Sequence, residues 1–407
     1  MSTMENDPRL IAERSGLAGV VPSWRRRLAS GDLGQLPVVI GLMLIWGIFL
    51  FASNGKFFLP INLVNLSLQM AATGTIAVGV VFVLLLGEID LTVGVLSGLA
   101  AAIMAVLNVK MGLPGPVAVI SAIVSGMLIG LFHGFWITRF RIPAFVVTLA
   151  GQIAWQGALL FVIGANGTIN LRDGFITAFA GTFFKGPSGY ALGALLIAYV
   201  GLAAWLNLRR RRAAGLHAEA MSVLLLRVAG LAVALAIAIT VLNGDRGVPL
   251  SFVLLVTIVV VMDYVLRRTR FGRMVMAVGG NSEAARRAGI PVTRVRVVVF
   301  MLASMFSAFG GVLAASYLLA VEQGTGTGPE LLNAIAAAVI GGTSLFGGRG
   351  TVWAALTGAL VIGSISNGMD LLALAASIRF MVIGGALLAA VTVDALARQG
   401  RQSAGRA

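Results

Sequence analysis

Few side chains in this sequence could carry out acid–base, nucleophilic or metal chemistry. There is no cysteine and there are only two histidines, His133 and His217. Thiolate chemistry and disulfides are therefore excluded, and a histidine metal site has few candidate ligands. Glu88 and Asp90 are carboxylates inside the apolar part of the chain, separated only by Ile89. Three roles are open for them: surface residues of a short turn, the lining of a water-filled path, or a proton relay. The relay is least favoured, because no His or Lys follows nearby.

Two short patterns suggest enzymatic chemistry but do not support it. Residues 186–189 read Gly-Pro-Ser-Gly and match the G-x-S-G of intramembrane serine proteases. We expect Ser188 in an outer connection, whereas His133 and His217 lie toward or beyond the inner face, out of reach of a nucleophile. The only Gly-Lys, at Gly55-Lys56, lacks the earlier glycine of a phosphate-binding loop. The chain is not predicted to be an enzyme, and an ATPase that drives it would be a separate chain.

The elements that carry these residues follow from a strongly apolar composition. Apolar residues make up 58% of the 407 and charged residues 11%, with a mean hydropathy of +0.98. A soluble domain is about a quarter charged. Long apolar stretches recur from Leu36 to Val393, so most of the chain is expected to lie in lipid. The net charge of +15 would suggest nucleic acid in a soluble protein, but here it indicates membrane topology.

We predict an all-α polytopic membrane protein, a bundle of about twelve transmembrane helices. The expected spans are about 36–52, 66–86, 91–108, 114–137, 143–164, 188–207, 222–242, 249–266, 297–319, 331–345, 351–367 and 376–394. Re-entrant segments are expected near about 87–94 and 341–350, where glycines interrupt the apolar pattern. The predicted organisation is a cytoplasmic tail over about 1–35, a transmembrane domain over 36–394 with an inner loop at 267–296, and a cytoplasmic tail over 395–407.

The placement of basic residues predicts the orientation of these spans. The polar stretch before the first apolar run has the wrong order for a cleavable signal peptide, so the first span is expected to be an uncleaved anchor. With the N-terminus inside, the inner connections hold most of the arginines, including 139, 141, 209–212, 267, 268, 270, 273, 286, 287, 294 and 296. The outer connections hold Lys56, Lys110, Arg172, Lys185 and Arg246. This bias predicts an even number of spans and two cytoplasmic termini.

The inner loop contains the pattern of one short helix. The residues that carry it are Gly279, Gly280, Asn281, Ser282, Glu283, Ala284, Ala285, Arg286, Arg287, Ala288, Gly289 and Pro291. Asn281 or Ser282 can cap the helix, and its acidic and basic residues complement the helix dipole. Gly289 and Pro291 end it. Such a helix could lie on anionic headgroups, but its alanines, in place of large apolar residues, favour a groove on another protein.

A family resemblance appears at this helix. Glu283-Ala284-Ala285 followed by Gly289 resembles the EAA loop of ABC importer permeases, the cytoplasmic coupling helix that docks on the ATPase subunit. The chain from about Leu36 to Val393 resembles the permeases of ribose, xylose and galactose import systems. Three further segments resemble this family in the right order, at 87–94, 141–151 and 340–348.

Two features resemble the xylose-type branch, and one segment departs from the family pattern. The extra basic loop and apolar span between 208 and 248, and the stretch Leu242–Pro249, point to the xylose type. A multiple-sugar permease of similar length is also open. The family usually carries Glu-Leu-Asp before Ala-Ile-Ala, whereas this chain has Leu331-Leu332-Asn333, with Glu330 displaced. The role of the family's acidic pair in gating or in docking the sugar-binding protein is therefore not carried over.

Polar side chains within the spans have two interpretations. They could line a path for a neutral sugar, or they could form hydrogen bonds between helices, which is commoner. The candidates are Asn65, Gln69, Gln152, Trp155, Gln156, Asn333 and Asn367, together with Glu88 and Asp90 as path or gating residues. We expect an ion pair between Asp263 and Arg267, a snorkelling Arg379 and a packing role for His133.

The resemblance implies the permease subunit of a bacterial inner-membrane ABC importer that moves a monosaccharide, with a xylose-type pentose favoured, by alternating access. It implies ATPase subunits, a periplasmic sugar-binding protein and a second permease copy as partners, besides membrane lipid and without nucleic acid. No cofactor is expected in this chain, since ATP and Mg belong to the ATPase. The alternative is a proton- or sodium-coupled secondary transporter, which would need ion-coordinating groups near the midplane. The sequence has few of these beyond Glu88 and Asp90.

Overall fold

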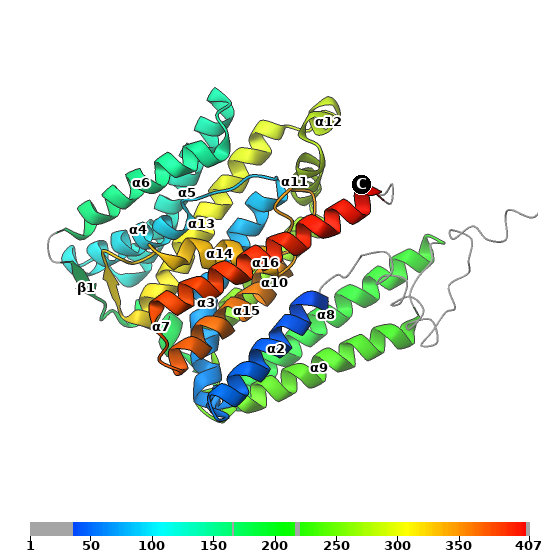
Figure 1. Ribbon diagram of the computed structural model, residues 1–407, viewed down its shortest axis with the longest axis horizontal. Helices are drawn as coiled ribbons and strands as arrows, with labels where there is room; N and C mark the ends of the chain where they lie inside the picture. Colours follow the sequence, from blue (N-terminus) through cyan, green and yellow to red (C-terminus); the bar gives the residue numbers. More distant parts are fainter. Residues whose placement is uncertain (1–35, 165–166, 216–219, 404–407) are drawn as a thin grey trace, which may run out of the picture. The chain divides into compact units, whose positions relative to one another are not determined.

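The computed structural model describes residues 36–164, 167–215 and 220–403 (Figure 1). The predicted N-terminal tail, His217 and the end of the predicted C-terminal tail lie outside these residues. Within them the chain forms two compact units. One holds residues 184–247 and 397–403, and the other holds residues 36–183 and 248–396.

The larger unit is a helical assembly with very little strand. Its helices are α2 (Leu36–Ala52), α3 (Pro60–Leu85), α4 (Val93–Ala105), α5 (Gly115–Phe140), α6 (Ala144–Ile163), α7 (Gly174–Gly181), α10 (Leu250–Arg268), α11 (Arg270–Gly280), α12 (Ser282–Arg287), α13 (Val292–Leu318), α14 (Pro329–Ile340), α15 (Trp353–Leu371) and most of α16 (Ala376–Ser403). A π-helical turn at Val106–Lys110 follows α4. Strand β1 (Thr168–Asn170) pairs antiparallel with β4 (Ala320–Glu322), with Ile169 opposite Val321. Strands β2 (Phe183–Phe184) and β3 (Val248–Pro249) form a second pair.

The centre of this unit is built around α3 and α13. In the most apolar window of α3, 89% of residues are buried. Helix α13 packs against α3, α4 and α5. Both helices are apolar on all sides and rich in Gly, Ala and Ser, which allows close packing where lipid supplies no hydrophobic drive between helices. The connections at both ends of α3 and α13 are therefore held by a rigid core.

The predicted membrane spans are helical in the structure, and each of the twelve predicted segments contains a helix. Among the described residues, eight helices are long and apolar enough to cross a membrane: α3, α4 with its π turn, α5, α6, α8, α9, α10 and α13. Three shorter apolar helices lie at Val38–Ala52, Pro329–Ile340 and Ala376–Thr392, and α15 falls in neither group. The polytopic helical class is confirmed, while the count of twelve spans and the side of each terminus stay predictions.

Two predicted breaks lie at the ends of α3 and α14. The backbone is not helical from residue 86 to 92 or from 341 to 352. Helix α14 has only 12 residues, in agreement with the short segment expected there. Entry of these segments into the membrane from one side stays a prediction.

The smaller unit is a hairpin of α8 (Pro187–Ala213) and α9 (Met221–Asn243), which lie side by side in Figure 1. The Tyr190 and Thr240 hydroxyls are 2.8 Å apart, and the Gly186 amide donates to Asn243 Oδ1 at 3.0 Å. The Ser188 hydroxyl donates to the Lys185 carbonyl at 3.0 Å. Ser188 therefore has a local structural role at the start of α8.

Two connections are more ordered than the sequence pattern indicated. The stretch from 167 to 187, which is expected on the outer side, contains α7, whose cap is Asp173, with its side chain accepting from the amides of Phe175 and Ile176. The inner loop holds two helices, not one. Helix α11 begins after Thr269, which accepts a hydrogen bond from the Gly272 amide at 3.2 Å. Its buried residues Gly272, Val275 and Val278 repeat every three positions, so it packs one face inward.

Candidate functional site

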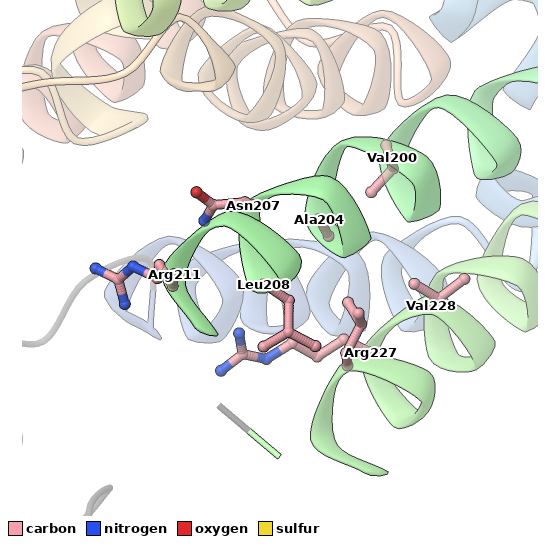
Figure 2. A pocket seen from close by; sticks show the side chains of 8 residues that line it. Val200, Ala204, Asn207, Leu208, Arg211, Arg227 and Val228 are labelled. Atoms are coloured by element: carbon pink, nitrogen blue, oxygen red, sulfur yellow. The ribbon is translucent and has the colours of Figure 1, made fainter. Parts of the chain in front are cut away.

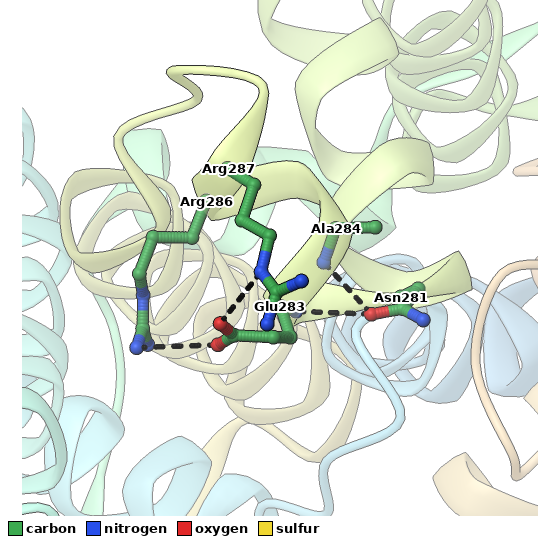
Figure 3. A network of polar contacts seen from close by, with 5 residues as sticks. All are labelled: Asn281, Glu283, Ala284, Arg286 and Arg287. Atoms are coloured by element: carbon green, nitrogen blue, oxygen red, sulfur yellow. Dashed lines mark hydrogen bonds and ion pairs between the residues drawn. The ribbon is translucent and has the colours of Figure 1, made fainter.

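Helix α12 has the cap that the sequence left open between two residues. Asn281 is the N-cap, and its Oδ1 accepts from the amides of Glu283 and Ala284 at 3.1 and 2.9 Å (Figure 3). Ser282 is the first helical residue. Gly289 follows the helix with φ of +80°, a left-handed conformation that an L side chain rarely adopts. The predicted start and end of this helix are confirmed.

Replacing Asn281 with alanine should loosen α12. The change removes both capping hydrogen bonds and should cost about 1 kcal/mol of local stability. We expect faster hydrogen exchange at the amides of residues 283–287, measured by mass spectrometry on the purified protein. Ser282→Ala is the matched control, because Ser282 does not cap the helix. Equal exchange in the two variants would contradict the assignment of the cap.

The charged residues of α12 are exposed and pair with one another. Glu283 lies 3.5 Å from Arg286 and 3.3 Å from Arg287 (Figure 3). Glu283 lies in the first turn and the arginines in the last, as predicted from the helix dipole. Their side chains are 58%, 66% and 80% exposed, so these pairs contribute about 0.5 kcal/mol or less to stability. The three charges are accessible to a partner at little cost to the fold.

The alanines of α12 divide between two faces. Ala284 and Ala288 are exposed, four residues apart on one side. Ala285 is only 5% exposed and belongs to the main hydrophobic core. The expectation that all three alanines form one docking face is therefore wrong for Ala285, because one side of the helix must pack on the larger unit. A face of small side chains remains, with Glu283 and Arg287 beside it.

Gly279 and Gly280, which were predicted as part of the coupling-helix motif, form the end of α11 and lie before α12. Gly279 lies directly against the last turn of α3 and the loop after α14. A Cβ atom on Gly279 would overlap the carbonyl oxygen of Leu85 and lie 2.9 Å from the Gly348 amide nitrogen. Gly280 has nothing within 4 Å of such an atom. The close approach therefore requires glycine at position 279 and not at 280.

Three glycine-bearing segments meet at this point, which we call the glycine junction (Gly87, Gly279, Gly347 and Gly348). The Gly348 amide donates to the Leu85 carbonyl at 2.9 Å. A Cβ on Gly347 would lie 2.8 Å from the Gly279 carbonyl oxygen and 2.9 Å from the Gly87 nitrogen. The chain before α12 thus contacts both helix breaks through backbone atoms. A displacement of α11 cannot be absorbed here by side-chain rotation.

Glu88 is tied to the helix that follows α12. Its Oε1 lies 2.7 Å from Nε of Arg296, in the first turns of α13. The contact is an ion pair without hydrogen-bond alignment, since both Arg296 Nε and Glu88 Oε2 are buried and lack a hydrogen-bond partner in the described structure. Burial raises the pKa of Glu88, and the Arg296 guanidinium partly opposes this. The sequence identified Glu88 but not its partner, which lies more than 200 residues away.

Breaking this ion pair should cost more than removing it whole. Glu88→Gln leaves the half-buried Arg296 without its counter-charge. Arg296→Gln leaves Glu88, which is only 12% exposed, without a positive partner. We expect each single variant to lose about 1–3 kcal/mol and the double variant to lose less than either single variant. Thermal unfolding of the purified protein in detergent measures this coupling. Strictly additive losses would show that the two charges do not interact.

Asp90 and His133 are buried beside α6. Asp90 Oδ1 accepts from the amide and hydroxyl of Thr92 at 2.8 and 2.6 Å, which fixes the start of α4. Its Oδ2 is buried and lacks a partner in the described structure. Trp155 Nε1 donates to Nε2 of the fully buried His133 at 2.9 Å. The buried packing role predicted for His133 is confirmed, although its Nδ1 lacks a hydrogen-bond partner in the described structure, and Trp155 is held by the contact with Nε2.

An amide cluster joins α3 and α15. Asn62 donates to Asn367 Oδ1 at 2.8 Å, and Asn367 donates to Gln69 Oε1 at 3.3 Å. Gln69 also contacts the Tyr317 hydroxyl of α13 at 3.5 Å. Gln69 and Asn367 thus make the hydrogen bonds between helices that one interpretation expected, and Asn62 was missed. Gln152 and Gln156 lie half-buried on α6 and are not members of this cluster, and a pathway role for any of these residues stays a prediction.

A second charged group lies where α15 ends and α16 begins. Arg379 forms an ion pair with Asp370, and it is also the charged neighbour of Glu330 on α14. The expected snorkelling of Arg379 stays a prediction, and the ion pair with Asp370 is a contact that the sequence did not indicate. Asn333, one turn after Glu330, is buried, and its Oδ1 lacks a partner in the described structure. The predicted pair of Asp263 and Arg267 is confirmed, at 2.7 Å.

A helical multi-span unit that presents a short, exposed and charged helix in the connection between two long apolar helices, here α10 and α13, is typical of a membrane permease subunit. Comparison with known proteins agrees. The family described as the permease component of branched-chain amino acid transport systems matches residues 62–391, and the chain belongs to this family. It is therefore a multi-pass membrane protein and a transport subunit, and this agrees with the predicted localisation in the bacterial inner membrane.

The chain is similar along most of its length to sugar permeases. It is 36% identical to the xylose transport system permease protein of Escherichia coli (strain K12). The 373 aligned residues cover 91% of this chain and 94% of that protein. It is 30% identical to the ribose import permease protein of Bacillus subtilis (strain 168), over 89% of this chain and 94% of that one. It is also 30% identical to the L-arabinose ABC transporter permease protein of Azospirillum brasilense, over 92% and 93% of the two chains. No solved structure matches.

Proposed function

We propose that this chain is the membrane-spanning subunit of an ATP-driven sugar importer and that α12 is the helix that docks on its ATPase. The observation that carries the proposal is that α12 packs one side on the larger unit and exposes the other. The exposed side of α12 presents Ala284 and Ala288 together with three charges. The opposite side is buried against the larger unit through Ala285. The whole element is held between α11 and α13. A surface helix that only bound lipid would present large apolar residues.

The glycine junction supports a route from α12 to the transport path. Helix α12 follows Gly279 by three residues, and Gly279 touches the end of α3 and the loop after α14 through backbone atoms. On the other side of α12, Arg296 is paired with Glu88 in the break between α3 and α4. A movement imposed on α12 would therefore reach the Glu88–Asp90 segment by both routes.

Alternating access then needs contacts that differ between ATP states. A partner ATPase would hold α12 in one position with ATP bound and in another without it, and the spans would open outward or inward accordingly. The equilibrium can shift only by the difference in binding free energy between the two states. Binding of the sugar alone does not supply this difference. ATP and Mg would be bound by the partner ATPase, with no cofactor in this chain.

For the substrate we propose a monosaccharide, with a xylose-type pentose favoured. The identity to the xylose permease, 36%, is higher than to the ribose and arabinose permeases, 30% each. Residues 208–248, where the sequence predicts the extra basic loop and apolar span of the xylose type, include the basic end of α8 and the apolar helix α9. We further propose a sugar-binding protein on the outer face and a second copy of this chain beside the first.

Uptake by the reconstituted complex tests this function. The chain would be placed in vesicles with the ATPase and the sugar-binding protein encoded beside its gene, and uptake of labelled xylose, ribose, arabinose and galactose would be compared. We expect ATP-dependent uptake of xylose above the other three sugars. Uptake that favours another sugar would overturn the substrate assignment, and no ATP-dependent uptake of any sugar would overturn the function.

A further inference from the structure

A cleft in the α8–α9 hairpin has no role in the transport proposal. It has a volume of about 370 Å³ and lies between the last turns of α8 and the first turns of α9. Its polar lining residues are Asn207, Arg211 and Arg227, and its apolar lining includes Leu208, Leu224 and Val228. In Figure 2 the guanidinium groups of Arg211 and Arg227 are directed toward the same end of the hairpin. Two helices thus contribute positive charge to one cleft.

The hairpin carries a concentrated positive charge. Helix α8 ends in four consecutive arginines, Arg209–Arg212, and Arg227 adds a fifth from α9. Neither helix contains an Asp or Glu, while Glu219 lies in the connection between them and Arg227 also interacts with another group of the chain. Arg209 lies over the ring of Trp205 at 5.5 Å, which directs that arginine to an aromatic face. Arg211 is the member of the run that lines the cleft, together with Arg227.

The cleft lies where the apolar part of the hairpin gives way to its polar end. Both helices are long and apolar enough to span a membrane. On α8 the apolar stretch ends at Leu208, directly before the arginines. Arg227 lies six residues into α9, about 9 Å along the helix, a distance that a snorkelling side chain can cover. Leu225 and Leu226, which precede it, are exposed, as expected of side chains that face lipid tails.

We propose that this cleft binds the phosphate headgroup of an anionic phospholipid, with Arg211 and Arg227 contacting the phosphate and Asn207 a neighbouring headgroup oxygen. The planar guanidinium fork suits paired hydrogen bonds to phosphate oxygens. Leu224 and Val228 supply apolar surface for the glycerol and the first part of an acyl chain. Basic pockets between membrane helices are known sites for anionic headgroups. Free phosphate shares this chemistry but has no use for the apolar lining.

Lipid retention on the full-length purified chain tests the proposal. Native mass spectrometry would compare bound phosphatidylglycerol with bound phosphatidylcholine for three proteins: wild type, Arg211→Gln/Arg227→Gln and Arg210→Gln/Arg212→Gln. The two double variants lose the same charge, but only the first alters the cleft. We expect the preference for phosphatidylglycerol to fall about tenfold in the cleft variant, which loses paired hydrogen bonds to phosphate as well as charge, and less than about threefold in the control, which loses only charge near the surface.

Equal losses in the two variants would overturn the proposal, because they would show a diffuse charge effect. Inorganic phosphate at millimolar concentration is the second arm, and displacement of phosphatidylglycerol by it would assign the cleft to a free anion. As a check on wild-type protein that needs no cleft variant, brominated phosphatidylglycerol should quench the fluorescence of Trp205 more than brominated phosphatidylcholine does. The contribution of Trp205 is obtained by subtracting the fluorescence of the Trp205→Phe variant from that of the wild type. Equal quenching by the two brominated lipids would also count against the site.

Discussion

Replacing Gly279 with alanine should slow ATP-dependent sugar uptake at least tenfold, whereas the same change at Gly280 should leave it near the wild-type rate. The added methyl at position 279 overlaps the Leu85 carbonyl, so α11 must move away from the end of α3. Overpacking typically costs about 1–3 kcal/mol, and the upper end applies here because the atom in the way belongs to the backbone. The helical preference of alanine over glycine returns only about 1 kcal/mol.

The pair of variants separates a local clash from a general effect of alanine in α11. Both residues end the same helix, and Gly280 has open space where its Cβ would be. Uptake in reconstituted vesicles and ATPase binding would be measured for both. We expect Gly279→Ala to bind the ATPase but to transport at least tenfold more slowly, since α12 itself is unchanged. Normal transport by this variant would show that the glycine junction is not the route of coupling.

Glu283→Arg should prevent association with the ATPase while membrane insertion and thermal stability stay close to wild type. The side chain is 58% exposed, and its ion pairs with Arg286 and Arg287 are surface contacts worth about 0.5 kcal/mol or less. Reversing the charge on the face that meets a partner is far more costly, by several kcal/mol for juxtaposed like charges. Co-purification of the tagged permease with the ATPase measures the effect.

The double variant Glu283→Arg/Arg287→Glu is the matched control for helix stability. It keeps an ion pair between positions four residues apart but moves the negative charge to the other end of the helix. If docking needs the carboxylate at position 283, the exchange will not restore ATPase binding. Transport at the wild-type rate by Glu283→Arg would show that α12 is not the coupling helix.

The elements fixed by local chemistry could be predicted from the sequence. Long apolar runs located the membrane helices, because in lipid the backbone must satisfy its own hydrogen bonds. The short helix α12 was predicted from the cap, the charge order and the final glycine, all within ten residues. Helix α11 was missed, although Thr269 caps it, because Gly272, Gly279 and Gly280 suggested a loop.

Partners far apart in the chain could not be predicted from the sequence. Glu88 was identified as unusual, but nothing near it indicates Arg296, since pairing depends on how α3 and α13 pack. Asn62 and Asn367 are separated by 305 positions. The exposure of Ala284 and the burial of Ala285 likewise depend on which side of α12 meets the core. These contacts are tertiary, and a periodic pattern carries no signal for them.

The most direct test of the account is transport by the chain alone. Vesicles containing only this protein would be given labelled sugar, and a proton or sodium gradient would be imposed across their membrane. In a second experiment the vesicles would also contain the ATPase, the sugar-binding protein and ATP. The account predicts no uphill accumulation in the first case and accumulation in the second. Uphill accumulation by the chain alone, driven by the ion gradient, would contradict it.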